Sequence, residues 1–167
     1  AFVGGSDVYL QKHDDDGNLI LAAKQLFSGL GAFAIEAAAS EQGLVVLATT
    51  SGGAGPDQVY YQTFDPAGQA TSGELALPPS RTESETFEAT AAGPAAYVAA
   101  EDDSETAFSR ITLRRILLAD GAVSNQPLTP PTVDALCPSL AVTGDKVAVS
   151  YRAFTPGAIR QLVFVDR

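Results

Sequence analysis

The chain has 167 residues, of which 46% are hydrophobic, enough for one ordinary domain or a few small repeats. Ten basic residues against twenty acidic ones give a net charge of -10, which excludes a general nucleic-acid binder and argues against docking on anionic lipid. No apolar run approaches the roughly 18 residues that a membrane helix requires.

Three residue types are rare or missing, and each absence limits the chemistry. The sequence contains no methionine, so Ala1 is not a translational start, and we expect a processed product or part of a longer protein. Cys137 is the only cysteine, which excludes an intrachain disulfide and cysteine-based metal motifs. Its apolar neighbours predict a small buried side chain. His13 is the only histidine, so a multi-histidine metal site cannot form within one chain.

Short segments recur along the chain at intervals of about fifty-one residues. Residues 8–18 align without a gap with residues 59–69, and Val, Tyr, Gln, Asp and Gly are identical; residues 113–121 form a weaker copy. Gly43, Gly93 and Gly144 each precede an apolar run, and Leu-Pro-Pro at 77–79 is matched by Leu-Thr-Pro-Pro at 128–131. Three landmarks with a common period predict a repeat protein.

The repeated segments are predicted to be strands, because β-branched and aromatic residues alternate in short runs. In chain order, we expect strands at 8–13, 35–39, 44–49, 58–65, 73–77, 110–118 and 159–165. The alanine-rich stretch 32–40 also favours a strand over a helix, since Phe33, Ile35, Ala37 and Ala39 alternate. Asp-x-x-Gly or Asp-Gly sequences at 14–18, 65–68 and 119–121 predict hairpin turns.

Each repeat therefore holds about four strands. We place a partial repeat at 1–31, full repeats at 32–80 and 81–131, and a partial repeat at 132–167. The first partial repeat should supply the last two strands of a unit, and the last should supply the first three.

Residues 7–18 (DVYLQKHDDDGN) and 57–69 (DQVYYQTFDPAGQ) resemble the third-strand signature of secreted bacterial β-propeller repeats. The resemblance implies four-stranded blades of about 50 residues, an extracellular, periplasmic or cell-surface location, and usually no catalysis by the blade itself. His13 departs from the pattern, because it stands where Phe64 supplies the aromatic residue.

The predicted fold class is therefore all-β, with four-stranded antiparallel blade-like repeats forming a β-propeller segment. Propellers close with about four to eight blades, and the chain holds just over three repeats, so this interpretation predicts a partner that adds strands or sheets. The partner would be another polypeptide or further copies of the chain. A β-trefoil, which needs no partner, and a β-sandwich are the alternatives.

The acidic turn suggests calcium, a cation that prefers carboxylate and carbonyl oxygens. Asp14, Asp16 and Asn18 are the candidate ligands, although the same residues suit a plain hairpin tip. No other cofactor is predicted.

Two further acidic groups are expected to be solvated loops: residues 101–105, and the looser group Glu83, Glu85 and Glu88. Glu36, flanked by Ile35 and Ala37, is the one candidate for a strand-borne catalytic carboxylate.

Exposed aromatic residues recognise glycans and proteins. Tyr61, Tyr97, Tyr151 and Arg115 are the candidates for a ligand or partner surface, although tyrosines on strands also suit the core. Arg114, Arg115 and Arg152 are expected to pair with acidic groups on neighbouring strands.

The sequence favours a non-enzymatic extracytoplasmic module that acts through protein–protein contacts within a larger protein or complex. A lectin-like glycan-binding domain and a fragment of a glycoside-active enzyme are the alternatives.

Overall fold

The computed structural model describes residues 2–4, 7–27, 32–50, 58–77, 87–102, 108–154 and 159–167, and these form fourteen strands. Sheet A comprises β1 (Phe2–Gly4), β2 (Asp7–His13) and β3 (Leu19–Phe27); sheet B comprises β4 (Ala32–Ser40), β5 (Gly43–Thr50), β6 (Gln58–Phe64) and β7 (Leu75–Ala76). Sheet C comprises β8 (Phe87–Ala92), β9 (Ala95–Asp102), β10 (Arg110–Leu117) and β11 (Val123–Pro127); sheet D comprises β12 (Asp134–Thr143), β13 (Lys146–Phe154) and β14 (Ile159–Asp166). Within the described ranges we find no helix that could cross a membrane.

All four sheets are antiparallel meanders in which chain neighbours pair, so the prediction of an all-β chain is confirmed. The stretch 32–40 is a strand, as its alternation predicted. Each sheet lies within one of the four segments that the sequence analysis proposed. Sheet A differs in holding three strands rather than two, because Phe2–Gly4 pairs with Asp7–Tyr9.

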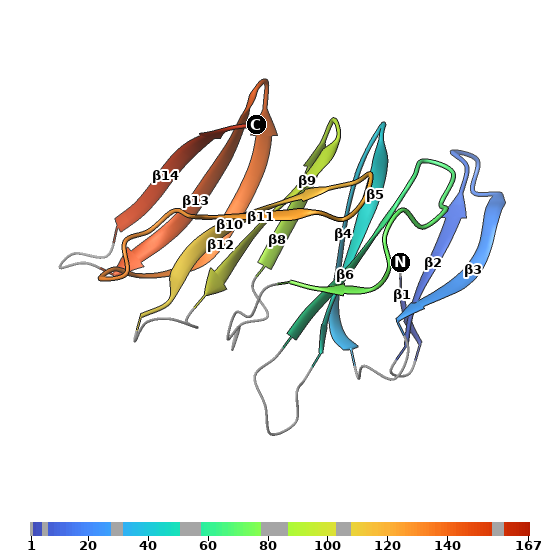
Figure 1. The fold of residues 1–167 in the computed structure, drawn as a ribbon, viewed down its shortest axis with the longest axis horizontal. Coiled ribbons are helices and arrows are strands. Elements are labelled where there is room, and N and C mark those ends of the chain that lie inside the picture. The colour runs from blue at the N-terminus through green and yellow to red at the C-terminus, as the bar shows by residue number, and fades with distance from the viewer. Residues whose placement is uncertain are drawn as a thin grey trace.

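The sheets follow one another in chain order along the long axis of the molecule (Figure 1). A separate hydrophobic cluster lies between each successive pair, so sheets B and C bury residues on both faces. This explains β9, in which every residue from Ala95 to Glu101 is buried and the usual alternation of buried and exposed residues is lost. The first strands of sheets B, C and D lie side by side, since β8 contacts both β4 and β12.

The hairpins β2–β3 and β6–β7 end in turns with the same hydrogen bonds. Asp14 N–H donates to the Asn18 carbonyl at 2.9 Å, and Asp65 N–H donates to the Gln69 carbonyl at the same distance. Gly17 and Gly68 both adopt a φ of 83°, which glycine reaches without a steric cost. Residues 51 positions apart in these two hairpins are therefore structurally equivalent.

The glycine landmark needs a correction. The two-residue turns that join the first and second strands lie at 41–42 in sheet B, 93–94 in sheet C and 144–145 in sheet D. Gly93 and Gly144 begin their turns, whereas Gly43 follows its turn and is the first residue of β5. A Cβ atom on Gly43 would lie 2.3 Å from the carbonyl oxygen of Phe64, so this glycine is required by close packing of the backbone.

Candidate functional site: the outer faces of the sheet stack

Sheet D is the last of the stack, and one of its faces is uncovered by any described residue. Val147, Val149 and Tyr151 point toward sheet C and are buried. The alternate residues on paired positions form what we call the outer face of sheet D: Ser139, Ala141, Ala148, Ser150, Arg152, Arg160, Leu162 and Phe164.

Two large apolar side chains dominate this outer face. Leu162 is 59% exposed and Phe164 is 55% exposed. Leu162, Leu113 and Tyr61 lie at equivalent positions on the third strands of sheets D, C and B. Each pairs with the corresponding second-strand residue, which is Ser150, Ala99 and Leu47 respectively.

Equivalence in register does not bring equal burial. Tyr61 is 2% exposed and Leu113 is 3% exposed, because the next sheet covers each of them. Leu162 is thus an apolar residue at a strand position that the following sheet covers in sheets B and C. Scattered exposed leucines are ordinary on protein surfaces, but one that repeats a core position marks a face of a different kind.

The outer face of sheet D also carries positive charge. Arg152 and Arg160 are exposed and pair across β13 and β14. The Arg152 guanidinium carbon lies 4.7 Å from the centre of the Phe154 ring. Both arginines stand out in a chain whose net charge is -10.

Sheet A, at the other end of the stack, has an exposed outer face as well. Leu19 is 54% exposed and Ile20 is 58% exposed. His13 is exposed, and its Nδ1 lies 2.9 Å from the Gly17 carbonyl oxygen. Phe64, which occupies the position equivalent to His13 in sheet B, is fully buried against sheet A. The replacement of the motif aromatic by histidine therefore falls on an uncovered face.

Two glutamates occupy equivalent positions on neighbouring first strands. Glu36 pairs with Leu47 in sheet B, and Glu88 pairs with Ala99 in sheet C. Burial raises the pKa of the Glu36 carboxyl, and the negative charge of Glu88 raises it further. The Glu88 carboxylate accepts the Leu140 N–H at 3.1 Å and so caps the free edge of β12.

Glu88 was wrongly predicted to lie in a loop, since it belongs to strand β8. Its acidic neighbours Glu83 and Glu85 lie outside the described residues. The separation between Glu36 and Glu88, close to the repeat period, was the signal in the sequence that could have placed Glu88 on a strand.

The prediction that residues 101–105 form a solvated loop is also wrong for the two of them that the structure describes. Glu101 and Asp102 belong to β9, and Glu101 is only 8% exposed. Glu101 accepts the Cys137 N–H at 2.8 Å. Residues 103–105 lie outside the described ranges.

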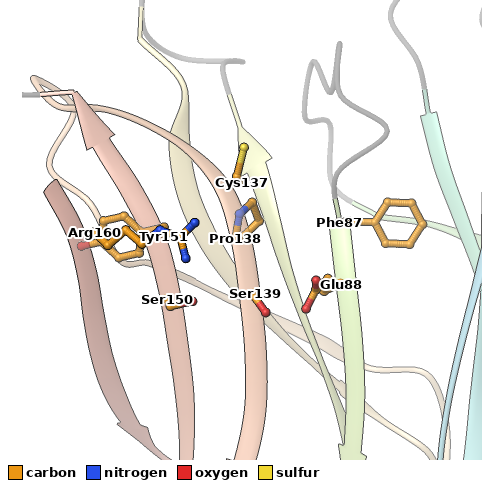
Figure 2. A pocket seen from close by; sticks show the side chains of 8 residues that line it. All are labelled: Phe87, Glu88, Cys137, Pro138, Ser139, Ser150, Tyr151 and Arg160. Carbon is orange, nitrogen blue, oxygen red and sulfur yellow. The ribbon is translucent and has the colours of Figure 1, made fainter. Parts of the chain in front are cut away.

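A cavity of about 390 Å³ opens beside β8 and β12 (Figure 2). Its wall is mostly polar or aromatic: Phe87, Glu88, Cys137, Pro138, Ser139, Ser150, Tyr151 and Arg160. Figure 2 shows Glu88 directed toward the Ser139 side of β8, with the Phe87 ring on the opposite side.

Cys137 borders this cavity and is exposed, so the prediction that it is buried is wrong. The register of β12 against β13 shifts between Leu136 and Ser139, and Cys137 has a φ of 54° at this irregularity. The shift reorients the side chains locally. An apolar sequence therefore did not place Cys137 in the core.

The predicted calcium turn uses its carboxylate for its own backbone. Asp14 Oδ1 accepts the N–H groups of Asp16 at 3.0 Å and of Asn18 at 2.7 Å, and Asp14 Oδ2 accepts the Asn18 side-chain amide at 3.0 Å. The hydrogen bonds from Asn18 lower the pKa of Asp14. The structure brings no three metal-ligating side chains together anywhere in its described part. Calcium binding stays a prediction from the sequence.

The predicted aromatic surface lies largely inside the molecule. Tyr61, Tyr97 and Tyr151 are each less than 5% exposed and belong to the clusters between sheets. The Tyr61 hydroxyl donates to the Gly121 carbonyl at 2.7 Å, and burial raises the pKa of Tyr61. Arg115 is half-buried on β10.

Arg114 is a buried charge. Its side chain is 1% exposed, and its Nη2 lies 3.6 Å from Asp102 Oδ2, which confirms the expected pairing across strands. Among the residues that the structure describes, its Nε and Nη1 find no hydrogen-bond partner. Burial therefore lowers the pKa of Arg114, while the charge of Asp102 opposes this effect.

No family model, curated protein or solved structure matched the chain.

Proposed function

We propose that the chain is a non-enzymatic extracytoplasmic assembly module, a β-propeller segment whose fourth sheet packs against an antiparallel sheet of another polypeptide. One observation carries the proposal. Leu162 is 59% exposed, whereas the equivalent Tyr61 and Leu113 are 2% and 3% exposed beneath the sheets that follow them. The extracytoplasmic location rests on the resemblance of the repeated motif to secreted proteins.

The arrangement of the four sheets supports a propeller segment. In chain order, sheets pack face to face, and first strands lie side by side along β4, β8 and β12. Radial repetition of small antiparallel sheets around a common axis produces this geometry. In such an array each sheet presents one face forward and one face backward, so the natural occupant of the outer face of sheet D is the backward face of a further sheet.

The partner face should combine apolar and acidic groups. Leu162 and Phe164 require apolar contacts, and Arg152 and Arg160 require carboxylates or hydrogen-bond acceptors if they are covered. The sheet A surface of a second copy, with Leu19 and Ile20 exposed, is the readiest source of such contacts in a purified sample.

The experiment measures native mass over a concentration series for three proteins. The natural chain should form species heavier than 17.2 kDa. The double variant Leu162→Asp, Phe164→Asp should stay monomeric and folded, because both side chains are already exposed. Phe108→Asp is the matched control, since Phe108 is 46% exposed and does not belong to the outer face of sheet D. Equal association of all three proteins would contradict the assignment of this face.

A second candidate function, glycoside chemistry as in propeller-type glycosidases, is favoured by the carboxylate pair Glu36 and Glu88. The raised pKa of Glu36 suits a carboxyl group that donates a proton beside a second carboxylate. Hydrolysis of a panel of aryl glycosides by the natural chain, lost in Glu36→Gln, would favour this function over assembly. Equal rates for the two proteins would exclude Glu36 from catalysis.

A further inference from the structure

Arg114 is a buried cation that leaves most of its hydrogen-bond donors unused. Its side chain is 1% exposed, and it is the largest of the described side chains that are fully buried. Its Nη2 lies 3.6 Å from Asp102 Oδ2, which is a charge contact rather than a hydrogen bond. Within the described ranges, Nε and Nη1 have no acceptor. The folded chain therefore lacks hydrogen bonds that water supplies to this guanidinium in the unfolded chain.

Thr49 presents an unused hydroxyl to the same space between sheets. It is completely buried, and its Oγ1 has no hydrogen-bond partner in the part of the chain that the structure describes. Thr49 pairs with Val59, and Arg114 pairs with Val98. Both valines belong to the hydrophobic cluster between sheets B and C. Because paired residues of antiparallel strands point to the same face, Thr49 and Arg114 both face this intersheet space.

The two polar groups lie toward the same end of sheets B and C. Thr49 is the last residue but one of β5, and its equivalent on β9 is Glu101. The Arg114 guanidinium is directed toward Asp102, the residue that follows Glu101 and ends β9. The register therefore brings the guanidinium toward the level of the Thr49 hydroxyl.

The chemistry of these groups indicates what could bind between them. A guanidinium has donors only and carries a permanent positive charge, and a threonine hydroxyl can donate. A water molecule would bring two more donors to a place where donors are already unused. An anion accepts hydrogen bonds without donating any, and its charge compensates Arg114. Because Arg114 and Thr49 are both fully enclosed, an anion of only a few atoms is favoured.

We propose that sheets B and C enclose a site for one small monovalent anion, of the size of chloride or formate, which accepts hydrogen bonds from Arg114 and Thr49. The anion stabilises the packing of the two sheets, because only the folded chain holds both donors together. The site belongs to β5 and β10 in the two middle sheets. The proposal therefore does not rest on the proposed function, which concerns the outer face of sheet D.

The test is urea unfolding at constant ionic strength and a fixed, low protein concentration, with sodium gluconate replaced stepwise by sodium chloride or sodium formate. Gluconate is too large for an enclosed site and serves as the reference anion. The unfolding equilibrium constant of the natural chain should fall about tenfold between about 2 and 200 mM chloride or formate. A fall with only one of the two salts supports the site and identifies its ligand as a halide or a carboxylate. No fall with either salt would overturn the proposal.

Three variants locate the effect on the proposed donors. Arg114→Met removes the charge and should abolish the dependence on the anion. Thr49→Val removes the hydroxyl at almost the same volume and should reduce the fall to about threefold or less. Thr63→Val is the matched control, since Thr63 is equally buried on the same face of sheet B but its Oγ1 accepts a hydrogen bond from Thr71 at 2.9 Å.

The control variant should keep the full tenfold fall in the unfolding equilibrium constant. An undiminished fall in Thr49→Val or Arg114→Met would contradict the site, and so would an equal reduction in Thr63→Val. If Arg114→Met does not fold, the comparison between Thr49→Val and Thr63→Val decides, because neither substitution removes a charge or changes the volume of the side chain appreciably.

Discussion

Leu113 and Leu162 occupy equivalent positions on β10 and β14, and the same substitution should have very different costs at the two sites. Leu113→Ala removes a side chain that is 97% buried between sheets C and D, where losing a leucine costs about 2–5 kcal/mol. Leu162 is 59% exposed, so about two fifths of its surface is buried. Complete burial of a leucine side chain stabilises a fold by roughly 1.5–3 kcal/mol, and Leu162 can contribute only that fraction. Leu162→Ala should therefore cost less than about 1 kcal/mol in the isolated chain.

Urea unfolding of both variants measures this difference in the free energy of unfolding, at the lowest protein concentration that gives a signal. At high concentration the cost of Leu162→Ala should rise, since association stabilises only a folded chain whose face is intact. Leu113→Ala should cost the same at both concentrations. A cost for Leu162→Ala that equals the cost for Leu113→Ala at low concentration would refute the reasoning, because the face would then be covered within one chain.

Two further predictions concern single residues. Glu88→Gln should move the pKa of Glu36 back toward its ordinary value, which carboxyl NMR titration measures. Because the folded state raises this pKa, ionisation of Glu36 disfavours the fold. The free energy of unfolding of the natural chain should therefore fall as the pH rises from the pKa of Glu36 in the unfolded chain through its pKa in the folded chain. Glu36→Gln should abolish that loss. Gly43→Ala should destabilise the chain by more than about 3 kcal/mol, since the new Cβ meets the Phe64 carbonyl oxygen. Gly17→Ala should cost about 1–2 kcal/mol, for its positive φ alone. Urea unfolding compares the two variants, and equal losses of unfolding free energy would contradict the packing argument.

Local sequence signals predicted most of the strands. The alternation in 32–40, the β-branched runs of β5 and β6, and the Asp-x-x-Gly turns all act within a few residues, so they can be recognised in a single sequence. The turn at 119–121 was predicted as well, although Gly121 closes it with a different hydrogen bond, to the Leu117 carbonyl.

The candidate sites were harder to predict because they depend on contacts between sheets. Glu88 looked like part of a solvated acidic loop, and only its contact with the edge of β12 shows why a carboxylate lies on a strand. Tyr61 and Tyr97 could not be assigned to core or surface from alternation, because sheets B and C bury both faces. The exposure of Leu162 could not be predicted from the sequence either, since a leucine is buried at the equivalent position 113.

Native mass in solution, with the intact denatured mass of the same sample, tests the central claim most directly. The account predicts a folded complex heavier than 17.2 kDa, formed by copies of the chain or with a second polypeptide that purifies with it. A single folded species of 17.2 kDa at every concentration would contradict the claim that the outer face of sheet D packs against another sheet.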